Sequence, residues 1–198
     1  MQIFRAEAFD TMGKILPRAT TISLQIFVIY LGITVMCALS YVAVGLTAFD
    51  AIVHAFTTVS TGGFSNYDSS FGHFSGAVEY VAIIFMIMAA LPFVRYVQLV
   101  NGNSRAIISD TQIKTFLITI LLVATFVFFV LNNLFPGDWE SALRKSLFNI
   151  TSIISGTGYS SDNYMAWGGM LVSVIFFIGL IGGCAGSTTC SVKVFRYQ

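Results

Sequence analysis

Three stretches of this 198-residue sequence combine glycine with small hydroxyl residues: "STGGF" at 60–64, "SGTGY" at 155–159 and "GGCAGSTT" at 182–189. Glycine adopts positive φ at little cost, so successive carbonyl oxygens of a glycine loop can point toward one axis. Rings of such carbonyls replace the hydration shell of a monovalent cation in potassium filters. The first two stretches therefore predict coordination of an alkali-metal cation by main-chain oxygens.

The candidate ion-binding residues belong to these two loops and would act mainly through their carbonyls. They are Ser60, Thr61, Gly62, Gly63, Ser155, Gly156, Thr157 and Gly158. The alternative is that each glycine loop simply turns the chain between two helices. The internal repeat described below argues against that alternative.

The composition predicts an integral membrane protein. The mean hydropathy is +0.83, and only 10% of the residues are charged, against about a quarter in a soluble domain. The net charge of +1 is too small to suggest a nucleic-acid partner. Cys37, Cys184 and Cys190 fall in or near apolar stretches, which favours reduced thiols over a disulfide or a metal site. The first twenty residues are mixed polar and charged, so we expect no cleavable signal peptide.

Four segments are candidates for crossing the membrane, which takes roughly 20 apolar residues. Residues 22–46, 76–94 and 115–135 qualify, and residues 165–181 form a shorter span that the third glycine stretch interrupts. All elements predicted from these patterns are helical.

Two further segments are helical in pattern but too short or too polar to span. Residues 47–59 begin with a Thr–x–x–Asp capping pattern, and residues 137–153 begin with Asp138 as an N-cap. Each ends in one of the first two glycine loops, so its negative dipole end would point toward a bound cation.

The two halves of the chain repeat the same order of elements. A shift of 95 residues places Gly63 on Gly158, and the first span over 117–141, close to the third span. The same shift pairs Ser60 with Ser155, Phe64 with Tyr159 and Ser65 with Ser160. The order span, short helix, glycine loop, span therefore occurs twice, which indicates one structural unit used twice.

The basic residues predict the orientation. Eight of the ten lie before the first span, between the second and third, or after the fourth, whereas Arg144 and Lys145 lie on the other side among six acids. The positive-inside rule then places the termini in the cytoplasm and both filter-like loops outside.

Several motifs resemble those of one family. "TVSTGGFS" (58–65) and "SGTGYS" (155–160) resemble the filter loops of the Trk/Ktr/HKT potassium-uptake family, and "GGCAGST" (182–188) followed by "KVFR" (193–196) resembles its most specific motif. "MQIFRAE" (1–7) and "FDAIVHAFTTVSTGGFS" (49–65) are similar to the second repeat of bacterial Trk-type pore subunits. The resemblance covers essentially the whole chain. It implies half of a four-repeat, potassium-channel-like pore, namely repeats two and three.

The resemblance also implies boundaries along the chain. Residues 1–20 would be a cytoplasmic segment, and residues 101–114 a cytoplasmic linker. The second pore repeat would occupy 21–100, with spans about 22–46 and 76–98, pore helix 49–59 and filter 60–64. The third would occupy 115–198, with span about 115–135, pore helix 138–153, filter 155–159, and a broken span 165–198 containing a gate loop at 182–191.

The third glycine stretch is, by resemblance, an intramembrane gate below the filter. The gate residues would be Gly182, Gly183, Cys184, Ala185, Gly186, Ser187 and Thr188. The three glycines weaken a helix by about 1 kcal/mol each relative to alanine, and the hydroxyls can bind freed backbone groups. A small-residue seam between packed helices is the alternative.

The function that the resemblance implies is potassium uptake across the bacterial inner membrane. K+ would be the transported ion, with no organic cofactor; alternatives are sodium or mixed-cation permeation, or a non-transporting scaffold. Glycine at 63 and 158 favours potassium, whereas Thr189, Cys190 and Ser191 replace further glycines that the family usually has. No strand and no Gly–Lys–Ser/Thr sequence accompany 182–189, so a phosphate-binding enzyme is not expected.

The partners follow from the resemblance as well. They are the first and fourth pore repeats of the same polypeptide, a second copy in a homodimer, a cytosolic nucleotide-binding regulatory subunit of the TrkA type, and membrane lipid. Of the individual polar residues, we expect His54 to make a structural hydrogen bond, Glu79 to lie at the membrane interface, and Arg95 to extend its charge toward the cytoplasm.

Overall fold

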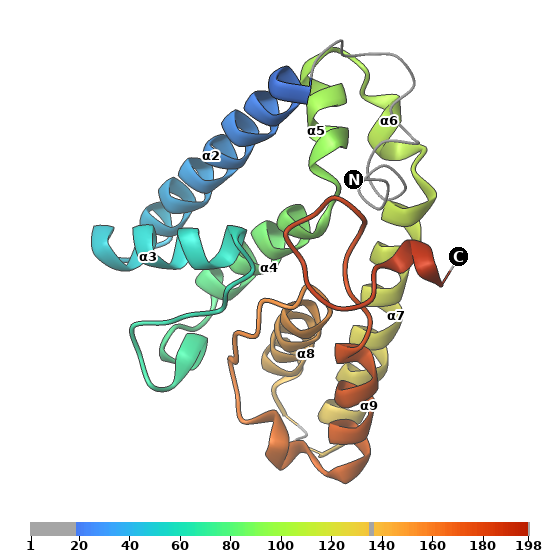
Figure 1. The fold of residues 1–198 in the computed structure, drawn as a ribbon. Helices are drawn as coiled ribbons and strands as arrows, with labels where there is room; N and C mark the ends of the chain where they lie inside the picture. Colours follow the sequence, from blue (N-terminus) through green and yellow to red (C-terminus); the bar gives the residue numbers. More distant parts are fainter. Residues whose placement is uncertain (1–18, 135–136, 198) are drawn as a thin grey trace.

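The fold of the described residues is built from helices and loops, with no strand. The computed structural model describes residues 19–134 and 137–197 (Figure 1). The two long helices are α2 (Ala19–Ala43) and α7 (Thr111–Leu134), and both are long and apolar enough to cross a membrane. The all-helical class that the sequence predicts is therefore confirmed for the described residues.

The elements follow each other in two similar halves. The first half contains α2, α3 (Ala48–Val59), α4 (Ala77–Ala90) and α5 (Phe93–Val100), and the second contains α7, α8 (Trp139–Ile154) and α9 (Gly169–Gly179). The short elements are η1 (Ser70–His73), α6 (Arg105–Ile108), η2 (Tyr164–Trp167) and η3 (Val194–Arg196). Figure 1 shows α8 beside α4, and the red loop after α9 arching between α4, α5 and α7. The predicted segment 1–20 lies, apart from its last two residues, outside the described residues.

Side-chain caps start the two short helices that precede the glycine loops. The backbone N–H of Asp50 donates to Thr47 Oγ1 at 3.2 Å, and the same hydroxyl donates back to Asp50 Oδ2 at 2.8 Å. Asp138 accepts from the N–H of Ser141 at 3.2 Å at the start of α8. These bonds satisfy N–H groups that a helix start leaves without partners. Both predicted caps are confirmed.

The predicted second span, 76–98, is not one continuous helix. It divides into α4 and α5, which meet at an angle of 91°. Pro92 has no N–H to continue the hydrogen-bond ladder of α4, and Leu91 before it is extended, with ψ of 157°. The second predicted span is therefore a bent pair of helices, because the proline ends α4 instead of being accommodated in it.

The predicted fourth span is also shorter than expected. Helix α9 has only 11 residues, since Gly168 at φ +101° starts it and the glycine stretch after Gly179 leaves the helical path. Within the described ranges, two helices and one bent pair have the length and apolarity of spans. The interruption predicted in the fourth span is thus present, and the second predicted span is bent as well.

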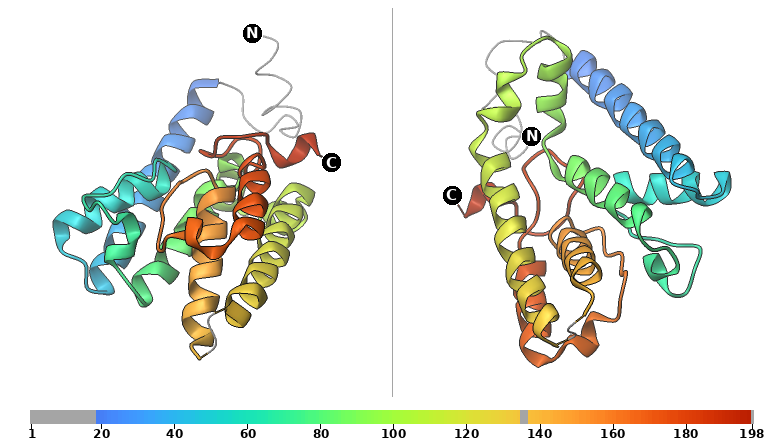
Figure 2. Two further views of the ribbon diagram at one scale, coloured as in Figure 1. Left: turned by 90° about the horizontal axis from the view of Figure 1, so that it is seen from below. Right: turned by 180° about the vertical axis from the view of Figure 1, so that it is seen from behind.

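Each half packs around its own hydrophobic cluster. Tyr41, Phe71 and Met86 lie at the centre of the first cluster, and Phe116 and Ile150 at the centre of the second. The contact between α4 and α8 joins them, and Figure 2 shows that α7 and α9 flank α8 on the side away from α2. Large apolar side chains on the outer faces of α2 and α7 remain exposed, as expected for helices that face lipid.

Candidate functional site

The first candidate filter loop is folded tightly against the end of α3. Ser60 is the C-cap of that helix, and Thr61 and Gly63 have left-handed φ angles of +52° and +67°. The N–H groups of Gly62 and Gly63 both donate to the carbonyl oxygen of Thr57, at 2.8 and 3.3 Å. The amides of the loop are thus turned back toward the helix.

The second candidate loop follows the same path at the end of α8. Ser155 is the C-cap, and Gly156 and Gly158 have φ angles of +70° and +82°. The N–H of Gly158 donates to the carbonyl of Ser152 at 3.3 Å. Under the shift of 95 residues, both left-handed positions and the accepting carbonyl coincide with those of the first loop. Thr57 and Ser152 are hydroxyl residues related by the same shift of 95. The sequence therefore contained this equivalence, but neither residue was among the predicted site residues.

The carbonyls of both loops are available for a ligand. Left-handed residues alternate with residues of negative φ, which turns successive carbonyls to the same side of the chain. In the part of the chain that the structure describes, no hydrogen bond is donated to the carbonyl oxygens of six loop residues: Thr61, Gly62, Gly63, Ser155, Thr157 and Gly158. Such oxygens are the ligands that a dehydrated alkali cation needs.

The structure brings the two loops into contact. A Cβ added at Gly63 would overlap the carbonyl oxygen of Thr157 and lie 2.9 Å from its carbonyl carbon. Beyond the filters, the N–H of Gly72 donates to the carbonyl of Ser160 at 2.9 Å, and the N–H of Ser160 to Ser70 Oγ at 3.2 Å. Two segments about 90 residues apart in the sequence therefore lie side by side.

The candidate gate residues form a closed loop after α9. Two backbone hydrogen bonds close the loop where it begins and ends. The N–H of Gly182 donates to the carbonyl of Val192 at 2.8 Å, and the N–H of Val192 donates to the carbonyl of Leu180 at 3.2 Å. Inside the loop, the N–H of Gly183 donates to Thr189 Oγ1 at 3.1 Å, and Ser187 Oγ donates to the Cys184 carbonyl at 2.6 Å. The hydroxyls thus replace the helical hydrogen bonds that the glycines give up.

This loop touches the ends of both short helices. Thr61 Oγ1 donates to the carbonyl of Thr188 at 2.9 Å, and Thr188 Oγ1 donates to the carbonyl of Val59 at 3.1 Å. A Cβ at Gly156 would overlap Cys190 Sγ, so the second candidate loop contacts that thiol directly. Cys190 lies within the predicted gate loop 182–191 but not among the individually predicted gate residues, and only the fold shows its contact with Gly156.

The remaining gate residues contact the bend between α4 and α5. The N–H groups of Cys184 and Thr188 donate to the carbonyls of Ala90 and Ala89, at 3.0 and 3.3 Å. The N–H of Phe93 donates to the carbonyl of Gly186 at 3.0 Å. The end of α4 and the start of α5 at Pro92 leave these backbone groups without partners inside a helix. The candidate gate loop supplies their hydrogen-bond partners. Ala185 contributes its N–H to Gln112 Oε1 at 3.2 Å, at the start of α7.

A buried ion pair joins the two halves between α4 and α8. Glu79 of α4 and Arg144 of α8 form a salt bridge, with side-chain exposures of 2% and 11%. Arg144 Nε also binds Glu140 at 3.0 Å, and Glu79 accepts from the N–H of Gly76 at 3.3 Å. The fold thus supplies a buried cationic partner for Glu79 from the other half, which the sequence pattern did not indicate.

The other two individual polar residues have specific partners. His54 is fully buried; its Nδ1 lies 2.8 Å from the carbonyl of Asp50 and its Nε2 3.1 Å from Ser65 Oγ. Its predicted structural hydrogen bond is confirmed. Arg95 Nε binds Asp110 at 2.7 Å, so this arginine is paired rather than simply extended toward water.

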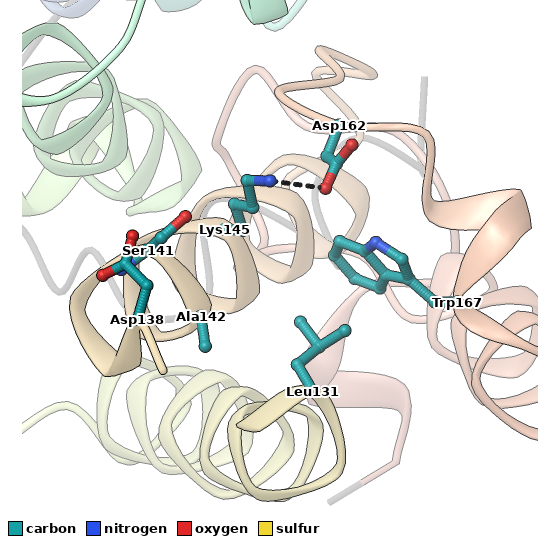
Figure 3. Close-up of a pocket in the computed structure, with 7 residues that line it drawn as sticks. All are labelled: Leu131, Asp138, Ser141, Ala142, Lys145, Asp162 and Trp167. Atoms are coloured by element: carbon teal, nitrogen blue, oxygen red, sulfur yellow. Dashed lines mark hydrogen bonds and ion pairs between the residues drawn. The ribbon is translucent and has the colours of Figure 1, made fainter. Parts of the chain in front are cut away.

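A small cavity of about 90 Å³ lies where the loop after the second filter returns to α8 (Figure 3). It is lined by Leu131, Asp138, Ser141, Ala142, Lys145, Asp162 and Trp167. Lys145 Nζ donates to Asp162 Oδ2 at 2.8 Å, and this contact ties the loop to the helix. The volume has room for only a few water molecules, so the cavity is a joint between segments rather than a ligand site.

Acidification is expected to loosen this joint. Partial burial raises the pKa of Asp162, but hydrogen bonds from Lys145 and from the backbone of Asn163 outweigh it, so the pKa lies below its usual value. A lowered folded-state pKa contributes stability above the unfolded pKa of about 4, and that contribution is lost as the pH falls through the folded value. In a Trp139→Phe background, Trp167 fluorescence should change below about pH 4. The Lys145→Met variant should lack this fluorescence change. A change of equal size in that variant would contradict its assignment to the Lys145–Asp162 contact.

Comparisons with known proteins give one consistent family. The family model TrkH, described as a cation transport protein, matches residues 5–197. The potassium uptake protein TrkI of Halomonas elongata is 35% identical over 201 residues, covering 100% of this chain and 40% of the relative. TrkH of Vibrio parahaemolyticus is 31% identical over 206 residues, covering 99% of this chain and 42% of the relative.

A solved structure gives the same result. The crystal structure of the potassium transporter TrkH from Vibrio parahaemolyticus matches with a TM-score of 0.86 at 29% identity, covering 94% of this chain and 41% of that one. The chain thus spans about two fifths of the length of the relatives that it matches.

Proposed function

Because the chain belongs to the TrkH family of cation transport proteins, we propose that it forms two adjacent quarters of a potassium-permeating pore in a bacterial cytoplasmic membrane. The matched relatives are potassium uptake proteins, and the family is one of transporters rather than enzymes. Each half of the chain supplies a span, a pore helix, a filter loop and a second, broken span.

The observation that carries this proposal is the doubled backbone path at the filters. Gly63 and Gly158 hold equivalent left-handed conformations, and the two loops touch at Gly63 and Thr157. Their carbonyls then replace water around K+, the ion that we propose is transported without an organic cofactor. The acids of the outer loops, including Asp68, raise the local cation concentration.

Exposed apolar faces support two further repeats of the same polypeptide, the first and the fourth. Helix α4 covers α8, but on α3 the side chains of Phe49, Ile52 and Phe56 are exposed, although this helix is too short to face lipid along a full span. A preceding unit would cover that face as α4 covers α8. On α9, Met170 and Phe177 are exposed and would receive the pore helix of a following unit.

The loop at 182–191 is proposed to be the gate. It lies against both filter ends, and its contacts with them are a few individual hydrogen bonds, each of which a small free-energy change can break. Such weakly held segments are the ones that proteins move. Lys193 and Arg196 beyond it fit a cytoplasmic side, which places the filters outward.

The remaining partners follow from the family resemblance. They are a second pore subunit in a homodimer and a cytosolic nucleotide-binding subunit of the TrkA type, and lipid would cover the exposed faces of α2 and α7. A regulatory subunit on the cytoplasmic side would have a short route to the gate, since Gln112 binds the gate residue Ala185 directly.

The test of the proposal is cation flux through the full-length protein that contains this chain, reconstituted in liposomes. We expect K+ to permeate in preference to Na+. Flux of neither ion, or equal flux of both, would contradict a potassium-selective pore.

Removing one hydroxyl from the gate should raise the resting flux. Thr188→Val keeps the shape of the side chain but loses the bonds to the carbonyls of Val59 and Ala89, both at 3.1 Å. Loss of one net hydrogen bond shifts an equilibrium about two- to tenfold toward the open state. K+ flux without regulatory subunit measures this. Ser173→Ala, which removes an exposed hydroxyl on α9, is the control and should leave flux unchanged. A resting flux of Thr188→Val at the native level would argue against the gate.

A further inference from the structure

The side chain that ends the second filter is inserted into the first half of the protein. Tyr159 directly follows Gly158, yet it belongs to the hydrophobic cluster of the first half and is only 1% exposed. Its ring lies 4.8 Å from that of Phe71 between centroids, and 6.2 Å from that of His54. The tyrosine therefore lies behind α3, the pore helix that carries the other filter.

The hydroxyl of Tyr159 is held by the last turns of α3. It lies 2.5 Å from Thr57 Oγ1 and 3.3 Å from Thr58 Oγ1, and it donates to the carbonyl of His54 at 3.2 Å. Thr58 Oγ1 is in turn 2.9 Å from the buried hydroxyl of Tyr41. One phenol group thus enters a buried hydrogen-bond network whose other members all belong to the first half.

This network is attached directly to both filters. The carbonyl of Thr57 accepts the N–H groups of Gly62 and Gly63, so Thr57 carries the first filter. The carbonyl of Tyr159 accepts Ser152 Oγ at 2.8 Å, and Ser152 carries the second filter through its own carbonyl. A displacement of the hydroxyl relative to Thr57 would therefore change the separation of the two loops.

The equivalent aromatic residue in the first half has no such hydroxyl. The shift of 95 residues pairs Tyr159 with Phe64, which is 75% exposed in this chain. The position after the filter glycine can thus hold an aromatic ring without a phenol oxygen. The oxygen at position 159 adds a specific tie between these two filters.

We propose that Tyr159 is a positioning residue for ion selection: its hydroxyl sets the separation of the two filter loops and so the preference for K+ over Na+. The inference rests on the proposed function, because it assumes that the loops form the filter. Selection between the two ions depends on the size of the carbonyl cage and on the stiffness with which its oxygens are held. A hydrogen bond between Tyr159 and Thr57, which hold the two neighbouring loops, affects both the size of the cage and its stiffness.

The test compares three variants of the full-length transporter by the ratio of K+ to Na+ flux in liposomes. Tyr159→Phe keeps the buried ring and loses the hydroxyl, and Thr57→Val removes its nearest partner. Each is expected to lower the ratio about two- to tenfold, mainly through higher Na+ flux, since one net hydrogen bond is lost. The double variant should be no worse than either single variant, because both remove the same contact.

The control is Tyr80→Phe, which removes a tyrosine hydroxyl bonded to Glu140 at 3.0 Å on the exposed flank of α4. Its flux ratio should stay native. A native ratio in both Tyr159→Phe and Thr57→Val, or additive losses in the double variant, would overturn the inference. Neither result would touch the proposed function, which fails only if the native protein does not select K+ or tolerates a side chain at Gly63.

Discussion

Potassium uptake is expected to be lost when Gly63 is replaced by alanine in the full-length transporter. The added Cβ would overlap the carbonyl oxygen of Thr157, so one of the two filter loops must move. The φ angle of +67° adds strain of about 1 kcal/mol for any residue with a side chain. Because the clash is with the backbone of the neighbouring candidate loop, no rotamer change can relieve it.

Substitutions at two other glycines distinguish the steric clash from the backbone strain as the cause of lost uptake. Gly158 has an equivalent φ of +82°, but a Cβ there meets no atom within 4 Å among the described residues, so Gly158→Ala tests backbone strain alone. Gly62 lacks positive φ, and its added Cβ would lie 3.2 Å from Ser60 Oγ, a contact that a small hydroxyl rotation can relieve. We expect Gly62→Ala to keep nearly native uptake. Gly158→Ala should lose part of the uptake, and Gly63→Ala should lose the most.

Growth of cells that depend on this transporter at low external K+ measures uptake, and the amount of protein in the membrane corrects for folding. Native uptake in Gly63→Ala would show that the contact with Thr157 is irrelevant to permeation. An equal loss in Gly62→Ala would show that the loop tolerates no substitution of any kind, and the proposed geometry would lose its support.

The largest expected effect on stability comes from the buried ion pair between α4 and α8. Arg144→Met leaves Glu79 buried without its cation, and breaking such a pair costs about 3–5 kcal/mol. Glu79→Gln should cost less, because the arginine keeps Glu140. The double variant Glu79→Gln/Arg144→Met should be more stable than Arg144→Met alone, since no unpaired charge remains buried.

Unfolding of the detergent-solubilised full-length protein, followed by circular dichroism against denaturant, measures these differences. Lys145→Met is the control, because the Lys145–Asp162 pair is about a third exposed and should be worth at most about 1 kcal/mol. Equal losses for Arg144→Met and Lys145→Met would mean that burial of the first pair contributes nothing. A double variant less stable than Arg144→Met would also contradict the electrostatic explanation.

Local patterns were sufficient for much of the architecture. Apolar runs predict α2 and α7, and the caps at Thr47 and Asp138 start the two short helices as expected. The glycine loops at the ends of those helices are recognisable because left-handed backbone requires glycine at defined positions. The repeat is visible because the same shift relates residue types and chain order.

Bends were harder to predict. Pro92 sits in an apolar run long enough for one span, and hydropathy averages over it. Whether a proline bends or ends a helix depends on partners for the freed backbone groups. Here those partners are the gate residues Cys184, Gly186 and Thr188, about ninety residues later in the chain.

What the sequence by itself determined was the membrane class, the helices that short patterns encode, and the two loops able to present carbonyls. Only the tertiary structure decided that Glu79 meets Arg144, that Tyr159 enters the other half, and that Cys190 lies under Gly156. The reason is physical: propensity, capping and hydropathy act over a few residues and leave a signature in them. Contacts between distant segments depend on how whole helices pack, and a single sequence does not display that packing locally.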